Sequence, residues 1–104
     1  MIPPYYAVIF TSKHKEHSDD YDIAAKRMNE LTAQQPGFLG IDSARNADGV
    51  GITVCYWDSI EAIKNWKENN EHQYAQQMGK KEWYESYSVR IAKVEQEYSM
   101  ETVV

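Results

Sequence analysis

Histidine, tryptophan and tyrosine side chains in the second half of the chain could bind and act on a planar ligand. His72 is a candidate catalytic general base, because an unperturbed histidine gains and loses its proton near neutral pH. The alternative interpretation is a histidine at a helix start that bonds a backbone carbonyl or a carboxylate. Two tryptophans could stack on a ligand or equally anchor the core, and three tyrosines could donate hydrogen bonds to a phenol or quinone oxygen. These candidate ligand-binding residues are Trp57, Trp66, Tyr56, Tyr84 and Tyr87.

The remaining reactive side chains predict neither a metal site nor a disulfide. Cys55 falls in the middle of a predicted strand and is expected to be an inert, buried thiol. As the single cysteine it cannot form an internal disulfide, which suits a reducing cytoplasm. His14 and His17 are expected in a polar loop, and they have no third ligand at a fixed spacing that would complete a zinc site.

Length and charge limit the classes of function. With 104 residues, the chain should form one domain over 1–104, with its core at about 5–98 and a loose tail at 99–104. No segment approaches the roughly 20 apolar residues of a membrane span, and no export signal opens the sequence. The net charge of −5 argues against a surface for nucleic acid.

Turn chemistry predicts the elements that must position the candidate residues. The Gln-Pro-Gly sequence at 35–37 should end a helix, because proline cannot donate a hydrogen bond and glycine tolerates left-handed backbone. Asp48 and Gly49 can form the tight turn of a hairpin. Its second strand leads into a helix for which Asp58 is the predicted N-cap, with Glu61 completing a capping box.

The rest of the chain completes an α+β pattern. We expect a first strand at 5–12, a helix that starts with the cap signals at 18–20 and runs to about 35, a second helical stretch at 71–80 and a last strand at 87–98. The apolar alternation of the last strand changes phase, which predicts a β-bulge near Ile91. The order β-α-β-β-α-(α)-β is the ferredoxin-like pattern with an antiparallel sheet.

The predicted sheet has two apolar faces. Odd and even positions of 5–10 are both apolar or aromatic, and 52–57 also offers two usable faces. Helices on one side of a sheet can cover only one of them. We therefore expect the other face to be buried against a second copy in a two-fold homodimer.

Four short segments, in this order, resemble the antibiotic biosynthesis monooxygenase domain family over roughly 5–98. They are Gln-Pro-Gly-Phe-Leu-Gly at 35–40, Tyr-Trp-Asp-Ser at 56–59, the stretch from Glu-Ala to Trp at 61–66, and Glu-His at 71–72. The resemblance implies a ferredoxin-like domain that pairs into a dimeric α+β barrel. That implied fold agrees with the two-faced strands.

The activity that the resemblance implies is oxidation of a small aromatic, phenolic or quinone-type substrate without a cofactor. Two alternatives stay open, because members of the family differ in activity. One is a non-catalytic dimer that binds a small aromatic or apolar ligand, and the other is a protein that binds or degrades haem. We expect neither a nucleic acid nor a membrane as a partner.

Two catalytic patterns of the family are only partly matched. The quinone-forming type has an asparagine four residues before the strand-end tryptophan and a tyrosine six residues after it; Trp57 matches, but Thr53 and Ile63 hold the other positions. The haem-degrading type has a second tryptophan nine residues on and a ligand histidine ten residues beyond that. Trp66 matches the second tryptophan, but Gln76 holds the ligand position.

Overall fold

The computed structural model of the chain describes residues 1–15 and 19–100. In this part of the chain, three α-helices and one π-helical turn accompany a four-stranded antiparallel sheet. The elements are, in order, β1 (Tyr5–His14), α1 (Asp19–Ala33), β2 (Phe38–Arg45), β3 (Val50–Trp57), α2 (Ile60–Lys67), α3 (Asn70–Met78), the π-helical turn η1 (Gly79–Trp83) and β4 (Tyr84–Val94). This order confirms the predicted ferredoxin-like α+β fold.

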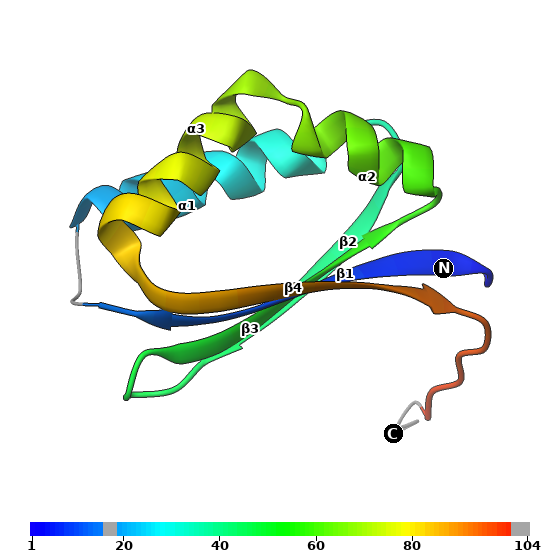
Figure 1. Cartoon of the computed structure of the whole chain (residues 1–104). Helices are drawn as coiled ribbons and strands as arrows, with labels where there is room; N and C mark the ends of the chain where they lie inside the picture. Colours follow the sequence, from blue (N-terminus) through cyan, green and yellow to red (C-terminus); the bar gives the residue numbers. More distant parts are fainter. Residues whose placement is uncertain (16–18, 101–104) are drawn as a thin grey trace.

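The sheet has the strand order β2-β3-β1-β4, and the helices all lie over one of its faces (Figure 1). Val8 of the central strand β1 pairs with Cys55 on β3 and with Ile91 on β4. These side chains point toward the helices, so Ala7 and its partner Tyr56 point to the other face. β1 and β3 therefore have the two distinct faces that the sequence predicted.

The turn between α1 and β2 needs a glycine. Gly37 has a φ of +86°, in the left-handed region, and a Cβ there would lie 2.6 Å from the Cβ of Ala62. Both the conformation and the close approach of α2 exclude a larger residue. Gly49 has a φ of +84° in the β2–β3 hairpin, which confirms the predicted turn.

The N-cap of α2 is Ser59, so the predicted cap at Asp58 and its capping box with Glu61 are wrong. The Ser59 hydroxyl oxygen accepts the backbone N–H of Ala62 at 3.1 Å. Asp58 instead donates its own backbone N–H to the carbonyl oxygen of Gly37 at 2.8 Å. That bond joins the end of β3 to the residue before β2. The N-cap of α2 is therefore one residue later than predicted.

The last strand is displaced from its predicted position. β4 begins at Tyr84, three residues early, and ends at Val94. Its pairing with β1 is regular past Ile91, and the one irregularity lies between Lys13 and His14 of β1, so the predicted bulge near Ile91 is wrong. The π-helical turn η1 ends at Trp83, and β4 follows it without a loop. The backbone N–H of Lys15 bonds the carbonyl oxygen of Trp83 at 2.9 Å, which fixes this end of β4 beside β1.

β1 also runs further than predicted. His14 is part of the strand, because its backbone N–H bonds the carbonyl oxygen of Gly49 at 3.0 Å, so its predicted place in a loop is wrong. His17 and the cap signal at Ser18 lie outside the described residues, as do residues 101–104 of the predicted tail. Within the described ranges, every helix is too short or too polar to span a membrane.

The core is centred where the end of β3 meets α2. Trp57 is 1% exposed and packs with Ala62, Ile63 and Trp66 of the following helix. Met28 of α1 and other partly buried apolar residues surround this cluster. Burial of these large side chains holds the helical layer on the sheet.

Candidate functional site

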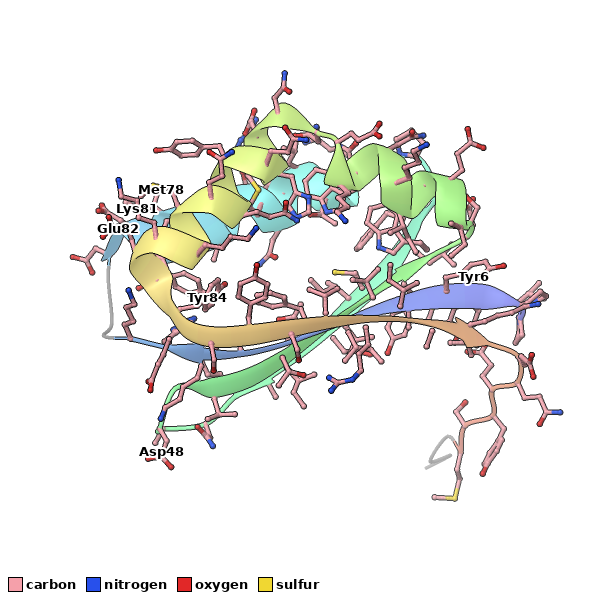
Figure 2. The ribbon with its side chains drawn as sticks, viewed as in Figure 1. Tyr6, Asp48, Met78, Lys81, Glu82 and Tyr84 are labelled. Atoms are coloured by element: carbon pink, nitrogen blue, oxygen red, sulfur yellow. The ribbon has the colours of Figure 1, made fainter. Side chains whose placement is uncertain are left out.

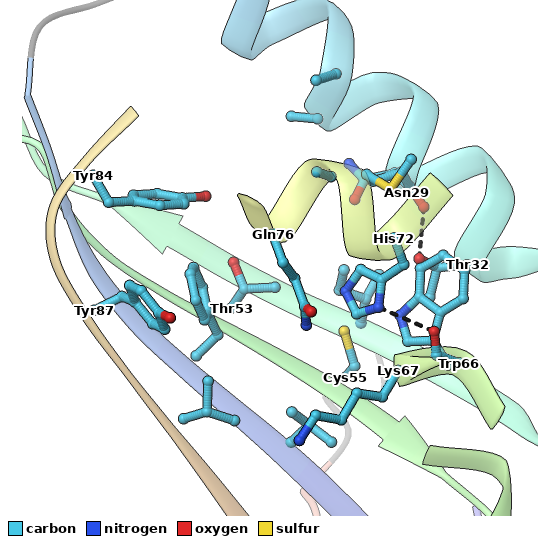
Figure 3. Close-up of a pocket in the computed structure, with 18 of the residues that line it drawn as sticks. Asn29, Thr32, Thr53, Cys55, Trp66, Lys67, His72, Gln76, Tyr84 and Tyr87 are labelled. Carbon is cyan, nitrogen blue, oxygen red and sulfur yellow. Dashed lines mark hydrogen bonds between the residues drawn. The ribbon is translucent and has the colours of Figure 1, made fainter. Parts of the chain in front are cut away.

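A cavity of about 440 Å³ lies between the sheet and the helices (Figure 3). Its size is typical of sites for small molecules. Val8 and Cys55 contribute to its floor from the sheet, and Met28 lines it from α1. Along β4, Val89 and Ile91 line the cavity and are still 50% and 55% exposed, so the cavity opens to solvent on that side.

His72 lines the cavity from the helical side and is held there by Trp66. Its Nδ1 lies 3.1 Å from the carbonyl oxygen of Trp66, and the two rings stack with centroids 4.3 Å apart and planes 8° apart. A carbonyl only accepts, so Nδ1 carries the hydrogen and Nε2 of the neutral ring keeps a lone pair. Figure 3 shows the Trp66 bond on one side of the ring and the other nitrogen directed toward Gln76 and the cavity.

The environment keeps His72 neutral. Burial lowers the pKa of His72, and the bond to the Trp66 carbonyl opposes that effect only in part. At neutral pH the side chain is therefore an unprotonated base. The bond from Nδ1 to a backbone carbonyl confirms the structural interpretation of this histidine, and its role as a catalytic base stays a prediction.

The two tryptophans are mainly structural supports of the cavity. Trp57 is almost completely buried, and its ring lies 6.5 Å from that of Trp66 between centroids. One face of Trp66 is covered by His72. Edges of both indoles line the cavity, but the stacked face of Trp66 positions the histidine rather than a ligand.

Tyr84 and Tyr87 line the other end of the cavity. Figure 2 shows Tyr84 between the sheet and the helical layer, and its ring contacts Phe10 with centroids 5.3 Å apart. Burial, followed by the neighbouring Tyr21 through its charge and a side-chain hydrogen bond, raises the pKa of Tyr84, so its hydroxyl stays protonated. Tyr87 is partly exposed at the open side of the cavity.

Tyr56 does not lie with the other four aromatic candidates. Trp57 and Cys55 point toward the helices, so the alternation of the strand turns Tyr56 to the opposite face. There its hydroxyl donates to Oδ2 of Asp42 at 2.9 Å, and its ring meets the edge of Tyr5. Tyr56 is therefore corrected to a residue of the far face of the sheet.

Several polar residues of the cavity were not singled out as ligand-binding candidates. Gln76 lies one turn after His72 on the same side of α3, a spacing that could have indicated it. Lys67 reaches the cavity from the end of α2 (Figure 3). Cys55 lies on the floor, where burial raises the pKa of its thiol to about 11, as expected for an inert side chain.

Nothing in the described ranges indicates a metal centre: no three His, Cys, Asp or Glu side chains come together there in a way that could hold an ion. The ring of His14 packs instead against Tyr21 and Tyr84, with centroids 4.1 Å and 5.3 Å away. His14 therefore packs behind two tyrosines that line the cavity, and it is not part of the lining itself.

Comparisons with known proteins agree with this architecture. Residues 4–78 match the family model described as antibiotic biosynthesis monooxygenase. An uncharacterized protein of Bacillus subtilis, YqjZ, is 56% identical over 95 residues, which cover 91% of this chain and 83% of that protein.

Solved structures show the same fold at low identity. SnoaB, a cofactor-independent oxygenase from Streptomyces nogalater, superposes with a TM-score of 0.78 at 11% identity, over 91% of this chain and 97% of its own. A putative antibiotic biosynthesis monooxygenase from Nitrosomonas europaea gives a TM-score of 0.76 at 13% identity, over 90% and 94% of the two chains.

Proposed function

The chain belongs to the antibiotic biosynthesis monooxygenase family, and we propose that it oxidises a small phenol or hydroquinone with molecular oxygen, using its own side chains and no cofactor. The observation that carries the proposal is His72, a neutral base whose Nε2 faces a cavity of ligand size. The similar fold of SnoaB, a cofactor-independent oxygenase, supports the same class of reaction.

In the proposed reaction, His72 removes the proton of a phenol. The phenolate gives electrons to oxygen far more readily than the neutral phenol does. For a phenol, one oxygen atom becomes the new carbonyl at a ring carbon that loses its hydrogen. The other atom leaves as water with that hydrogen and the phenol hydrogen, so a phenol and O₂ give a quinone and H₂O.

Tyr84 can assist by binding an oxygen of the substrate or product. Its raised pKa keeps the hydroxyl protonated, so it can exchange its hydrogen bond to Tyr21 for one to a carbonyl or phenolate oxygen of the ligand. Tyr84 and His72 line the same cavity from different elements, η1–β4 and α3. A planar molecule between them would meet a base on one side and a donor on the other.

Oxygen gas labelled with the heavy isotope tests this proposal. We expect a naphthol incubated with the protein to give a naphthoquinone that contains one labelled oxygen atom, with water as the other product. The buffer should contain a chelator, and a sample without protein gives the background. A quinone without label, or formation at the background rate, would contradict the monooxygenase proposal and leave a ligand-binding module as the function.

We further propose that the protein is a homodimer that buries the far face of the sheet. That face carries Ile9, Val54 and, at 48% exposure, Ile52, on the side of the sheet opposite the helices. Exposed apolar side chains on a sheet face are costly in water, and the same face of a second copy would cover them with two-fold symmetry.

Sedimentation at micromolar concentration should give twice the chain mass of 12.1 kDa. Val54→Asp should shift the protein toward the monomer, because it would bury a charge in the interface. Ile23→Asp is the matched control, since Ile23 is exposed on α1 on the other side of the molecule. A monomer for the unmodified protein would refute the dimer.

A further inference from the structure

The charged side chains that line the cavity all have the same sign. Arg45, Lys67 and Lys80 contribute to its wall, and no Asp or Glu among the described residues does. The chain as a whole is acidic, with 16 Asp and Glu against 11 Lys and Arg. The charge of the cavity lining is therefore positive, although the net charge of the whole protein is negative.

Arg45 is fixed in place by neutral partners. Its Nη2 donates to the hydroxyl oxygen of the buried Ser12 at 2.8 Å, and its Nη1 donates to the carbonyl oxygen of Gly49. The guanidinium lies across Gly51, where a Cβ would come within 2.6 Å of its Cζ. These contacts orient the group but leave its charge uncompensated.

The two lysines add charge from the helical side. Lys80 lies in η1, which leads into Tyr84, and Lys67 ends α2 with its side chain directed over the sheet (Figure 3). The ion pairs found in the described part of the chain involve other residues. Burial keeps His72 neutral, so these three side chains supply the positive charge of the lining.

We infer that the cavity binds an aromatic anion, a planar apolar molecule with one carboxylate, and that Arg45 pairs with the acid group while Lys67 and Lys80 add to the positive potential of the lining. The inference rests on the proposed function and narrows its substrate to phenols or hydroquinones that carry an acid. The apolar floor takes the ring system, and Arg45 can donate its remaining N–H groups to the acid.

Two fluorescent probes of nearly the same shape test the inference without any turnover. Anilinonaphthalenesulfonate carries an acid group, whereas phenylnaphthylamine is its neutral counterpart. We expect the full chain to bind the anionic probe roughly tenfold more tightly than the neutral one, with added salt reducing the difference. Naphthoate should displace the anionic probe at lower concentration than naphthylmethanol.

Charge-removing variants assign the effect to the cavity. Arg45→Gln should weaken binding of the anionic probe by roughly five- to tenfold, because a charge that Ser12 and Gly49 hold in a fixed orientation is lost. Lys67→Gln and Lys80→Gln should each weaken it by roughly two- to threefold, because exposed and flexible lysines contribute less. Lys64→Gln is the control on the same helix as Lys67, outside the cavity lining, and should change nothing.

Gly51→Ala gives a second variant that displaces the Arg45 guanidinium and keeps its charge; it should reproduce part of the Arg45→Gln loss. None of the variants should alter binding of the neutral probe. Equal affinity for the two probes, binding of neither, or an affinity for the anionic probe that Arg45→Gln leaves unchanged would overturn the inference. Because oxygen consumption is not measured, failure of the oxygenase proposal would leave these results unchanged.

Discussion

Replacing His72 by alanine is expected to lower the turnover of a phenol substrate by roughly 10²-fold or more, the usual scale for a positioned base. The bond from Nδ1–H to the Trp66 carbonyl leaves Nε2 as the proton acceptor, and alanine offers none. The initial rate of quinone formation measures the effect. Dimer stability should change little.

Gln73→Ala is the matched control for His72→Ala. Gln73 lies next to His72 on α3 but is exposed and does not line the cavity, so its loss should leave the rate unchanged. If His72→Ala kept the full rate between about pH 6 and 8, where a histidine base titrates, the base assignment would be wrong. A tyrosine or the acidity of the substrate would then have to account for the step.

The pH dependence of the unmodified protein follows from the same histidine. Burial lowers the pKa of His72, so the base should stay active as the pH falls through about 6.5, the ordinary histidine value, and be lost only below it. The unfolded chain binds this proton more readily, so His72 should reduce folding stability as the pH falls from that value through the lowered pKa. His72→Ala should remove this part of the pH dependence in both rate and stability.

Trp57→Ala should lower the free energy of unfolding by about 3–5 kcal/mol, the range for a buried tryptophan truncated in a core. Trp57 pairs with Tyr6 of β1 and Phe38 of β2, and its indole meets Phe38 at 5.5 Å between centroids. It also packs against Trp66, which holds His72. A domain with a total of about 5–15 kcal/mol would lose much of its stability.

Denaturant unfolding followed by circular dichroism measures this loss. Trp57→Phe keeps an aromatic ring and should cost clearly less than Trp57→Ala. If the alanine variant fails to fold, the phenylalanine variant still gives a measurable shift in the midpoint. An average substitution lowers the free energy of unfolding by about 1 kcal/mol. If Trp57→Ala lowered it by less than that, Trp57 would not be the centre of the core.

Local signals were sufficient to predict most of the fold. The hairpin and the end of α1 depend on single backbone conformations, and Gly37 and Gly49 both have the positive φ that these turns require. The two faces of β1 follow from strict alternation along a strand. The order of the elements along the chain indicated the ferredoxin-like pattern as a whole.

The errors arose where contacts between distant segments decide the structure. The longer β1 depends on the bond from His14 to Gly49, and the early start of β4 depends on the bond from Lys15 to Trp83. Neither contact leaves a pattern in the neighbouring sequence. Tyr56 was misplaced for a simpler reason, because it was grouped by residue type although it adjoins the inward-facing Trp57 in a strand.

The cavity could be predicted only in part. Residue type indicated His72 as a candidate base and Trp66 as a candidate aromatic, but it did not indicate the direct stack between them. Arg45 is placed at the cavity by the pairing of β2 with β3 and by its hydrogen bond to Ser12, which is 33 residues away in the sequence. A charge pattern assembled from separate elements is visible only after the chain has folded.

A crystal structure of the protein with a bound naphthol would show whether His72 is placed to act as the base. We predict that the ligand lies in the cavity between the sheet and the helices, with its hydroxyl group donating a hydrogen bond to Nε2 of His72. Nδ1 should still bond the carbonyl oxygen of Trp66. A ligand bound outside this cavity, or inside it with Nε2 of His72 turned away from its hydroxyl group, would show that His72 is not the base.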